Sequence, residues 1–439
     1  MVDMNDTLQN STEPPAESQL PRMPESEALG DAHEPIPANS KDSAKLRDVQ
    51  DPTWLDRSLA GLLAWDWEKT AWLALLIVAA VIRLVALDNR TASHDESEHA
   101  WFAYNLYAGK GYEHSPVYHG PFIYHVIALF YLIFGASDVT ARVPTALFGL
   151  GIVGMMWFMR RWLGKYGAFL AAVLITFSPA LLHYSRHTRH DIYELFWAVV
   201  LIVAVFRYLE ASSGKNERWL YLAAAALSLA LASKEDAFIH GAALGGFLLL
   251  IIAFRWLGAR LGADIPEEER EAPLHMTWRD VGILAGIVVV ALLGAAVFKL
   301  AGMSGFGNSG STAQMIAALV TILLPPVVAV GLAVWYGVRR TGDSETAPSF
   351  SPAMDLVILL GTLILPWISP FAIRALGYDP LDYTTGIYST LSVLVAFVGI
   401  AAVVGVFWNF RRWVISAAIF TAIFVVLFTT CLLYTSRCV

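Results

Sequence analysis

Charged side chains are scarce in this chain. Asp, Glu, Lys and Arg make up 15% of its 439 residues, and 56% of the residues are hydrophobic. Because soluble domains average about 25% charged residues, this composition excludes an ordinary soluble protein and predicts a polytopic membrane protein. The net charge of −7 identifies no partner, because residues 1–50 hold ten acidic and four basic residues, a balance of −6. We expect no nucleic-acid partner.

Cysteine is also nearly absent. Cys431 and Cys438 are the only two, which excludes a disulfide framework or a thiolate metal site upstream of them. The last nine residues change character abruptly and show no recognisable terminal pattern. We therefore expect a truncated or chimeric end and assign no function to the tail over residues 434–439.

Several familiar motifs are missing as well. The chain contains no P-loop, no G-x-G-x-x-G after a strand, no H-E-x-x-H and no G-x-S-x-G. Its first 30 residues show no cleavable signal peptide, so the first span must direct insertion. Residues 1–50 are rich in Pro, Ser and acidic residues, which predicts disorder. We interpret residues 1–69 as a disordered acidic cytoplasmic arm with an interfacial lead-in.

Long apolar runs dominate the remainder. A spanning helix needs roughly 20 apolar residues. The candidate spans are 70–87, 143–160, 167–184, 192–209, 218–233, 237–256, 281–300, 315–337, 354–373, 387–408 and 413–433. The segment 218–233 is short, but its Ala-rich composition permits close helix packing.

The apolar segment 122–134 is too short for a span and contains His125, which favours an interfacial amphipathic helix. If it is left out and the N-terminus is cytoplasmic, every short loop rich in Arg and Lys falls inside. The sequence therefore predicts an all-α protein of about 11 transmembrane helices, with one amphipathic helix on the outer face after the first span. The odd number of spans places the C-terminus outside.

This topology brings three polar stretches to the outer face, over residues 88–120, 182–191 and 233–236, with Arg142 at the outer start of the second span. Nine of the 11 histidines lie in or beside this outer zone. Scattered histidines would not segregate in this way, so the zone is the expected site of chemistry.

The first stretch carries Asp95 and Glu96, a few residues after the first span. A carboxylate at this position suits a general base acting on an acceptor hydroxyl. With His94, the two carboxylates could alternatively bind a divalent cation, Mg or Mn. The simpler alternative is an acidic outer loop without chemistry.

The other two stretches add cations. Asp191 suits the N-terminus of the following helix as a cap, but capping does not explain Arg186 and Arg189 beside it. Arginine suits bidentate recognition of phosphate. Lys234 is either part of a local ion pair at a turn or a ligand for a lipid phosphate. Glu194 would be costly in hydrocarbon, so we expect it to face the bundle interior.

Five sequence stretches together resemble membrane glycosyltransferases of the C-type fold. They are S-H-D-E-S-E-H-A at 93–100, H-G-P at 119–121, D-V-T-A-R-V-P-T-A-L-F-G at 138–149, S-R-H-T-R-H-D at 185–191 and S-K-E-D-A-F at 233–238. The protein O-mannosyltransferase and aminoarabinose-transferase group looks like this, as do predicted membrane mannosyltransferases of the flippase-associated subgroup. The resemblance covers about residues 70–260, a catalytic transmembrane half, and leaves residues 261–433 as C-terminal transmembrane helices.

The resemblance implies roles for particular residues. Asp95 becomes the catalytic carboxylate with Glu96 beside it, and Asp191 joins the same pocket. Candidates for the donor phosphate are Arg142, Arg186, Arg189 and Lys234. The implied donor is a polyprenyl-phosphate-linked sugar, and the acceptor is a lipid, a glycan or a protein. The implied location is the plasma membrane, with the active site on the outer face.

Two other functions stay open at this point. One is a transporter or flippase-associated subunit whose outer polar zone is a substrate vestibule. Transporters usually place their ionisable groups near the midplane and show paired halves with broken helices, which this sequence does not. The other is a scaffold without activity. The segregation of ionisable residues to one face favours the transferase.

Overall fold

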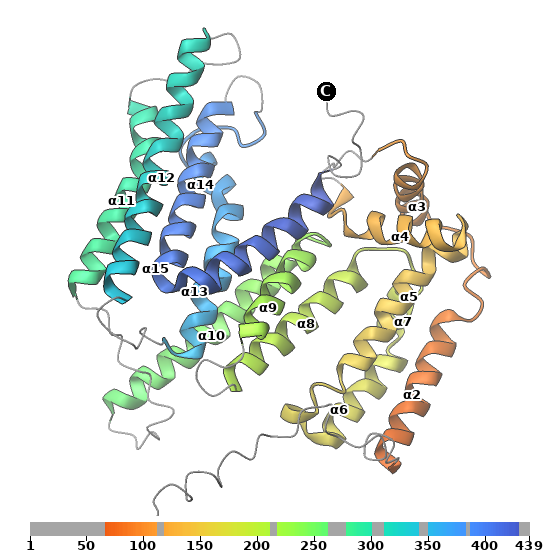
Figure 1. Cartoon of the computed structure of the whole chain (residues 1–439). Helices are drawn as coiled ribbons and strands as arrows, with labels where there is room; N and C mark the ends of the chain where they lie inside the picture. The colour runs from red at the N-terminus through yellow and green to blue at the C-terminus, as the bar shows by residue number, and fades with distance from the viewer. Residues whose placement is uncertain are drawn as a thin grey trace, which may run out of the picture. The chain divides into compact units, whose positions relative to one another are not determined.

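The computed structural model describes residues 66–111, 118–210, 217–261, 278–300, 311–341, 350–382 and 387–429. Every regular element in these ranges is a helix, so the all-helical prediction is confirmed for the described part of the chain (Figure 1). The predicted arm is described only from Asp66 onwards, and both cysteines and the predicted tail lie outside the described residues.

The predicted spans correspond closely to helices. In chain order these are α2 (Trp67–Leu84), α5 (Asp138–Met155), α6 (Arg160–Phe177), α8 (Asp191–Glu210), α9 (Glu217–Leu231), α10 (Ala237–Arg260), α11 (Trp278–Leu300), α12 (Thr312–Thr341), α13 (Pro352–Ile364), η3 (Leu365–Ile368), α14 (Ser369–Ala375) and α15 (Ile387–Phe428). Polar caps fix several of the starts. The Asp66 carboxylate accepts a hydrogen bond from the Lys69 amide, and Ser137 and Ser351 cap α5 and α13 in the same way.

Fewer helices of the described residues meet the length and hydropathy expected of a membrane span than the 11 spans that the sequence predicts. In the described residues, six helices are long and apolar enough to cross a membrane, and a seventh span results if the α5–α6 pair, bent by 117°, is counted as one. Charge and length account for part of the difference: α2 carries Glu68, Lys69 and Arg83, and α9 has 15 residues. The predicted break between 408 and 413 appears as non-helical backbone at Asn409 inside the 42-residue α15.

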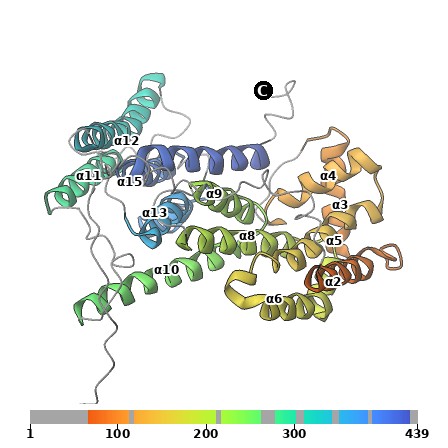
Figure 2. The same cartoon turned by 60° about the horizontal axis from the view of Figure 1, so that its bottom comes forward.

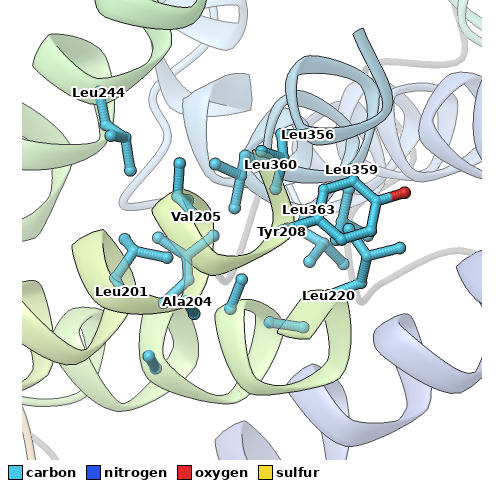
Figure 3. Close-up of a cluster of buried hydrophobic side chains, with 14 of the residues drawn as sticks. Leu201, Ala204, Val205, Tyr208, Leu220, Leu244, Leu356, Leu359, Leu360 and Leu363 are labelled. Atoms are coloured by element: carbon cyan, nitrogen blue, oxygen red, sulfur yellow. The ribbon is translucent and has the colours of Figure 1, made fainter. Parts of the chain in front are cut away.

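The largest hydrophobic core joins α8, α9, α10, α13 and α15, so it crosses residue 260, where the resemblance ends. Figure 3 shows Val205 and Tyr208 of α8, Leu220 of α9 and leucines of α13 converging in it. Ala223, Ala224 and Ala226 of α9 are fully buried. These small side chains let the helices approach closely, which is the reason the short 218–233 segment packs as an inner helix.

Three further helices build the predicted outer zone. They are α3 (His94–Tyr107), α4 (Phe122–Phe134) and α7 (Pro179–Ser185). The helix α4 coincides with the predicted short amphipathic segment, and it packs on α3 and α5 (Figures 1 and 2). The sequence predicts a loop where α3 lies, and the structure corrects this prediction to a helix.

Candidate active site

The helix α3 begins in the middle of the first polar stretch because of a capping box. The Ser93 hydroxyl accepts from the Glu96 amide at 3.3 Å, and the Glu96 carboxylate accepts from the Ser93 amide at 3.0 Å. The signature Ser-x-x-Glu is readable in the sequence and was missed there. The capping box places Asp95 and Glu96 in the first helical turn, where the helix dipole favours negative charge.

Glu96 is buried at the centre of an ion-pair network. Its two oxygens accept from Arg142 at 3.1 and 3.3 Å and from Arg90 at 2.9 and 3.0 Å. The Thr188 amide donates to the same carboxylate at 3.2 Å. Burial alone would raise the pKa of Glu96, but the hydrogen bonds from Arg142 and from the Ser93 and Thr188 amides lower it to about 2. Glu96 therefore joins α3, α5 and the α7–α8 connection as an ionised positioning residue.

The position of Arg142 corrects its predicted role as a ligand for the donor phosphate. Its side chain is only 3% exposed. Besides Glu96, its guanidinium donates to the carbonyl oxygens of Leu87 at 2.6 Å and Arg90 at 2.9 Å. Arg142 thus fixes the connection between α2 and α3. Arg90, its partner across Glu96, was not singled out in the sequence.

Arg186 and Arg189 are three positions apart but bind different partners. The Arg186 guanidinium donates to the carbonyl oxygens of Ile82, Arg83, Val85 and Ala86, at 2.7 to 3.3 Å, and so caps the C-terminal end of α2. Arg189 instead lies 3.3 Å from an Asp95 oxygen and 3.7 Å from an Asp191 oxygen. Only Arg189 of this predicted pair contacts the two aspartates.

A chain of ion pairs connects all three predicted outer stretches. It runs from Asp95 through Arg189 to Asp191, and from there to Lys234 at 2.8 Å, which also pairs with Asp236 at 2.8 Å. Burial would lower the pKa of Lys234, but its bonds to Asp191 and Asp236 outweigh burial and raise it. Asp95 is 45% exposed, so its carboxylate stays open to a ligand while Arg189 holds one side.

Two buried histidines form the wall behind the aspartates. The rings of His99 and His190 meet edge to face at 4.6 Å, and His190 Nε2 donates to the Gly120 carbonyl at 3.1 Å. Burial lowers the pKa of His99 to about 4 and holds that of His190 well below its usual value. Both imidazoles are therefore neutral at pH 7.

The H-G-P sequence forms the crossing between the α3–α4 connection and the α9–α10 turn. The amides of Gly120 and Phe122 donate to the carbonyls of Ser233 and Ala232, at 3.3 and 3.0 Å. A Cβ atom at position 120 would lie 2.0 Å from the Ala232 oxygen, so only glycine fits this approach. His119 has a positive φ of 62° and lies 2.7 Å from the Glu235 carboxylate.

The predicted metal ligands do not converge. His94 is 86% exposed and lies 3.6 Å from Glu98, while Glu96 turns inward onto two arginines. In the described ranges, no group of three or more His, Cys, Asp or Glu side chains is arranged to hold a metal ion. The donor set of His94, Asp95 and Glu96 thus does not fit a single Mg or Mn ion.

Glu194 lies one turn after Asp191 on α8 and is buried, in agreement with the prediction that it faces the interior. It pairs with His240 of α10 at 2.6 Å. A second buried ionisable group, Arg83 of α2, was missed in the sequence. Its guanidinium donates to the Ala79 and Ile175 carbonyls and to the Ser185 hydroxyl, and none of these partners is a carboxylate.

This arrangement provides an accessible carboxylate, Asp95, next to the cations Arg189 and Lys234. Such a set can remove a proton from a hydroxyl and stabilise negative charge on a neighbouring phosphate. The surrounding groups, Glu96 and the neutral histidines, hold these side chains in place.

Comparison with known proteins identifies two kinds of relative. Solved structures to which the chain is similar include ArnT from Cupriavidus metallidurans in the apo state (19% identity, TM-score 0.36, covering 79% of this chain and 62% of that one). The archaeal oligosaccharyltransferase AglB from Archaeoglobus fulgidus is similar as well (17% identity, TM-score 0.37, 82% and 51%). The chain spans less than two thirds of the length of either protein.

No curated protein sequence matches the chain. A family of sequences does match it in part, over residues 118–261, a segment that includes Asp191, Arg189 and Lys234 but not Asp95. The resemblance expected from the sequence is therefore confirmed for this segment, which matches the family described as dolichyl-phosphate-mannose-protein mannosyltransferase.

Proposed function

We propose that this chain is an integral-membrane glycosyltransferase that moves a hexose, with mannose favoured, from a polyprenyl-phosphate donor to an acceptor at the outer face of the membrane. The observation that carries the proposal is the chain of ion pairs from Asp95 through Arg189 and Asp191 to Lys234. It pairs the half-exposed Asp95 carboxylate with Arg189, and Asp191 links Arg189 to the second cation, Lys234. Transfer from a lipid phosphate needs both kinds of group.

In the proposed reaction, the acceptor hydroxyl oxygen bonds to the anomeric carbon while the bond from that carbon to the phosphate oxygen breaks. The electron pair of the broken bond leaves with the polyprenyl phosphate, and the hydroxyl proton passes to the Asp95 carboxylate. Because a phosphate is a weak base, its departure needs no strong general acid. A single displacement of this kind inverts the anomeric configuration.

The cations act on the leaving group. Arg189 and Lys234 both pair with Asp191, which positions them, and their remaining N–H groups stabilise the phosphate as negative charge develops on it. Because His94, Asp95 and Glu96 do not fit one metal ion, no step is assigned to a metal.

Two observations support the donor and the location. The family that matches residues 118–261 is described by a dolichyl-phosphate-linked mannose as donor and a protein as acceptor. Sugar nucleotides are confined to the cytoplasm, so a site on the outer face requires a lipid-borne donor. The distribution of Arg and Lys among the short loops supports a cytoplasmic N-terminus and aspartates on the outer side, and we propose the plasma membrane as the location. The acceptor can be a protein, a lipid or a glycan.

A transfer assay tests the proposal. The purified full chain would receive radiolabelled polyprenyl-phosphate-mannose with a crude membrane acceptor fraction, and GDP-mannose would serve as the donor control. We expect transfer from the lipid donor only, with Asp95→Asn reducing kcat by at least about 10²-fold, as loss of a general base implies. Asp88→Asn is the matched control, because Asp88 is an exposed aspartate in the same connection.

Three results would contradict the proposal. Transfer that survives Asp95→Asn would show that Asp95 is not the general base. Retention of configuration in the product would exclude a single displacement. Flux of the lipid donor across proteoliposomes, with no covalent product from any acceptor, would favour the flippase-associated alternative.

A further inference from the structure

A cleft of about 410 Å³ lies between the residues that follow the C-terminal end of α2 and the helix α7, and Arg90, which pairs with Glu96, lines it. We call it the α2–α7 cleft. Its apolar wall consists of Ala86, Leu87, Pro179 and Leu182, and its polar groups are Asn89, Arg90, His183 and Arg186. The proposed transfer reaction uses none of these residues.

Positive charge is in excess around the cleft. Arg83, Arg90, Arg142 and Arg186 surround the end of α2, whereas the carboxylates of this region are Glu96, which pairs with two of the arginines, and the exposed Asp88. No carboxylate lines the cleft itself. A low-dielectric pocket with excess positive charge favours an anionic ligand.

Arg90 has donors left for such a ligand. Its described hydrogen bonds to Glu96 and His187 all come from Nη2, and the side chain is 45% exposed. Arg90 lines the cleft, and its Nε and Nη1 are not used in these hydrogen bonds. His183, which stacks on His187 at 5.3 Å, and Asn89 provide neutral hydrogen-bonding groups beside it.

Exposed apolar residues lead into the cleft from two helices. Val81 of α2 and Val85, the C-cap of α2, come shortly before Ala86 in the chain, and Leu174 and Phe177 of α6 come shortly before Pro179, which lines the cleft. A ligand that follows these surfaces has an apolar chain attached to its anion. This combination describes a membrane lipid with a charged head group.

The charge of the site distinguishes between lipids. The described hydrogen bonds of Arg186 all go to the carbonyls at the end of α2. The guanidinium edge that is available to a ligand is therefore that of Arg90. One cationic edge with neutral donors suits a singly charged phosphodiester, the group that phospholipids and sugar-linked polyprenyl phosphates share, better than a phosphate monoester, which carries about −1.5 to −2 at pH 7.

We propose that the α2–α7 cleft is a binding site for the phosphodiester head group of an anionic phospholipid, separate from the site of the polyprenyl-phosphate donor. Occupancy places an anion on the free edge of Arg90, whose other edge holds Glu96. The lipid therefore stabilises the α2–α3 connection, which leads into the first turn of α3 with Asp95. Binding does not depend on the transfer reaction, so it can be tested even if that proposal is wrong.

The test is lipid retention. The full chain would be reconstituted in vesicles of equal phosphatidylglycerol and phosphatidylcholine, extracted in detergent and weighed by native mass spectrometry. We expect retained phosphatidylglycerol in excess over phosphatidylcholine. Leu182→Trp, which fills the cleft, and Arg90→Lys, which keeps a charge for Glu96 but removes the free edge, should weaken retention about tenfold, as loss of one charge-assisted hydrogen bond implies.

A control variant and competing ligands decide the identity of the ligand. Arg374→Gln removes an exposed arginine of α14, which packs on η3 and α15, and should retain the lipid normally. Neither farnesyl phosphate nor farnesyl-phosphate-mannose, which has the phosphodiester of the proposed donor, should displace phosphatidylglycerol, and inorganic phosphate should have no effect. Retention unchanged in Leu182→Trp, with normal folding shown by its thermal unfolding midpoint, would overturn the proposal. Preferential binding of farnesyl phosphate or farnesyl-phosphate-mannose would assign the cleft to the polyprenyl-phosphate donor instead.

Discussion

Asp95 and Glu96 are adjacent in the sequence but have opposite environments. Glu96 is buried between two arginines and its pKa is about 2, whereas Asp95 is half-exposed and contacts Arg189. Successive positions on a helix point about 100° apart, so a helical turn at this point must separate the two carboxylates. A buried, fully hydrogen-bonded carboxylate is suited to holding structure, and an accessible one is suited to proton transfer.

Glu96→Gln should destabilise the protein by about 3 kcal/mol, because it leaves Arg90 and Arg142 without their buried counter-ion. The measurement is thermal unfolding in detergent at pH 7. Glu98→Gln is the control, since Glu98 pairs only with the exposed His94. Equal stability of the two variants would show that the Glu96 network has no structural role.

The positions of α3 and α4 depend on one contact, between the α3–α4 connection and the α9–α10 turn. The connection between them passes directly over the α9–α10 turn at Gly120, and His190 donates to the same glycine from the start of α8. The outer zone is therefore one packed unit rather than three separate loops. This packing brings the second and third polar stretches against the first.

Gly120→Ala should lower both stability and transfer. Its Cβ would overlap the Ala232 carbonyl, which is backbone and cannot move without shifting the α9–α10 turn and Lys234. The expected loss of stability is about 1 to 3 kcal/mol by thermal unfolding, as overpacking usually produces. Gly154→Ala in α5 meets nothing within 4 Å and should be neutral. A neutral Gly120→Ala would mean that the crossing is looser than the structure shows.

At the scale of the whole molecule, the core links the two halves that the sequence distinguishes. Asp355 of α13 accepts from Tyr208 of α8 at 2.5 Å and from Trp408 of α15 at 2.7 Å, and Arg412 joins it to Glu217 of α9. The C-terminal helices thus support the helices that carry Asp191 and Lys234.

Stability should fall in acid. His99 has a pKa of about 4 against an ordinary 6.5, and Glu96 has one of about 2 against 4.5, so the unfolded chain binds more protons than the folded one below about pH 6.5. Both groups contribute fully to the free energy of unfolding above pH 6.5. The contribution of His99 is lost as the pH falls from 6.5 toward 4, and that of Glu96 is lost as it falls from 4.5 toward 2. Thermal midpoints between pH 4.5 and 7.5 should therefore decrease with acidity.

The variant His99→Phe should flatten this dependence, whereas His94→Gln, which alters an exposed imidazole, should not. A midpoint that is constant from pH 7.5 to 4.5 in the unmodified protein would contradict the assignment of buried neutral histidines.

The predicted topology is tested by labelling. Single cysteines at Glu113, which lies outside the described residues, and at Lys165, in a chain with Cys431 and Cys438 replaced by serine, should react with an impermeant maleimide from opposite sides of sealed vesicles. Labelling of both from the same side would overturn the arrangement of 11 spans.

The sequence by itself determined the helical membrane character and the positions of most helices, because hydrophobic length is a local property that the bilayer selects directly. From the charge of the loops it also predicts that the polar zone lies on the outer face. It also predicted that residues around Asp95, Asp191 and Lys234 act together. It favoured Asp95 over Glu96 as the base by resemblance, but it did not predict the burial of Glu96 or distinguish Arg189 from Arg186 and Arg142, because partners distant in the chain decide which charges are buried and which stay open. Only the tertiary structure assigned those partners: Arg90 and Arg142 to Glu96, the end of α2 to Arg186, and the two aspartates to Arg189.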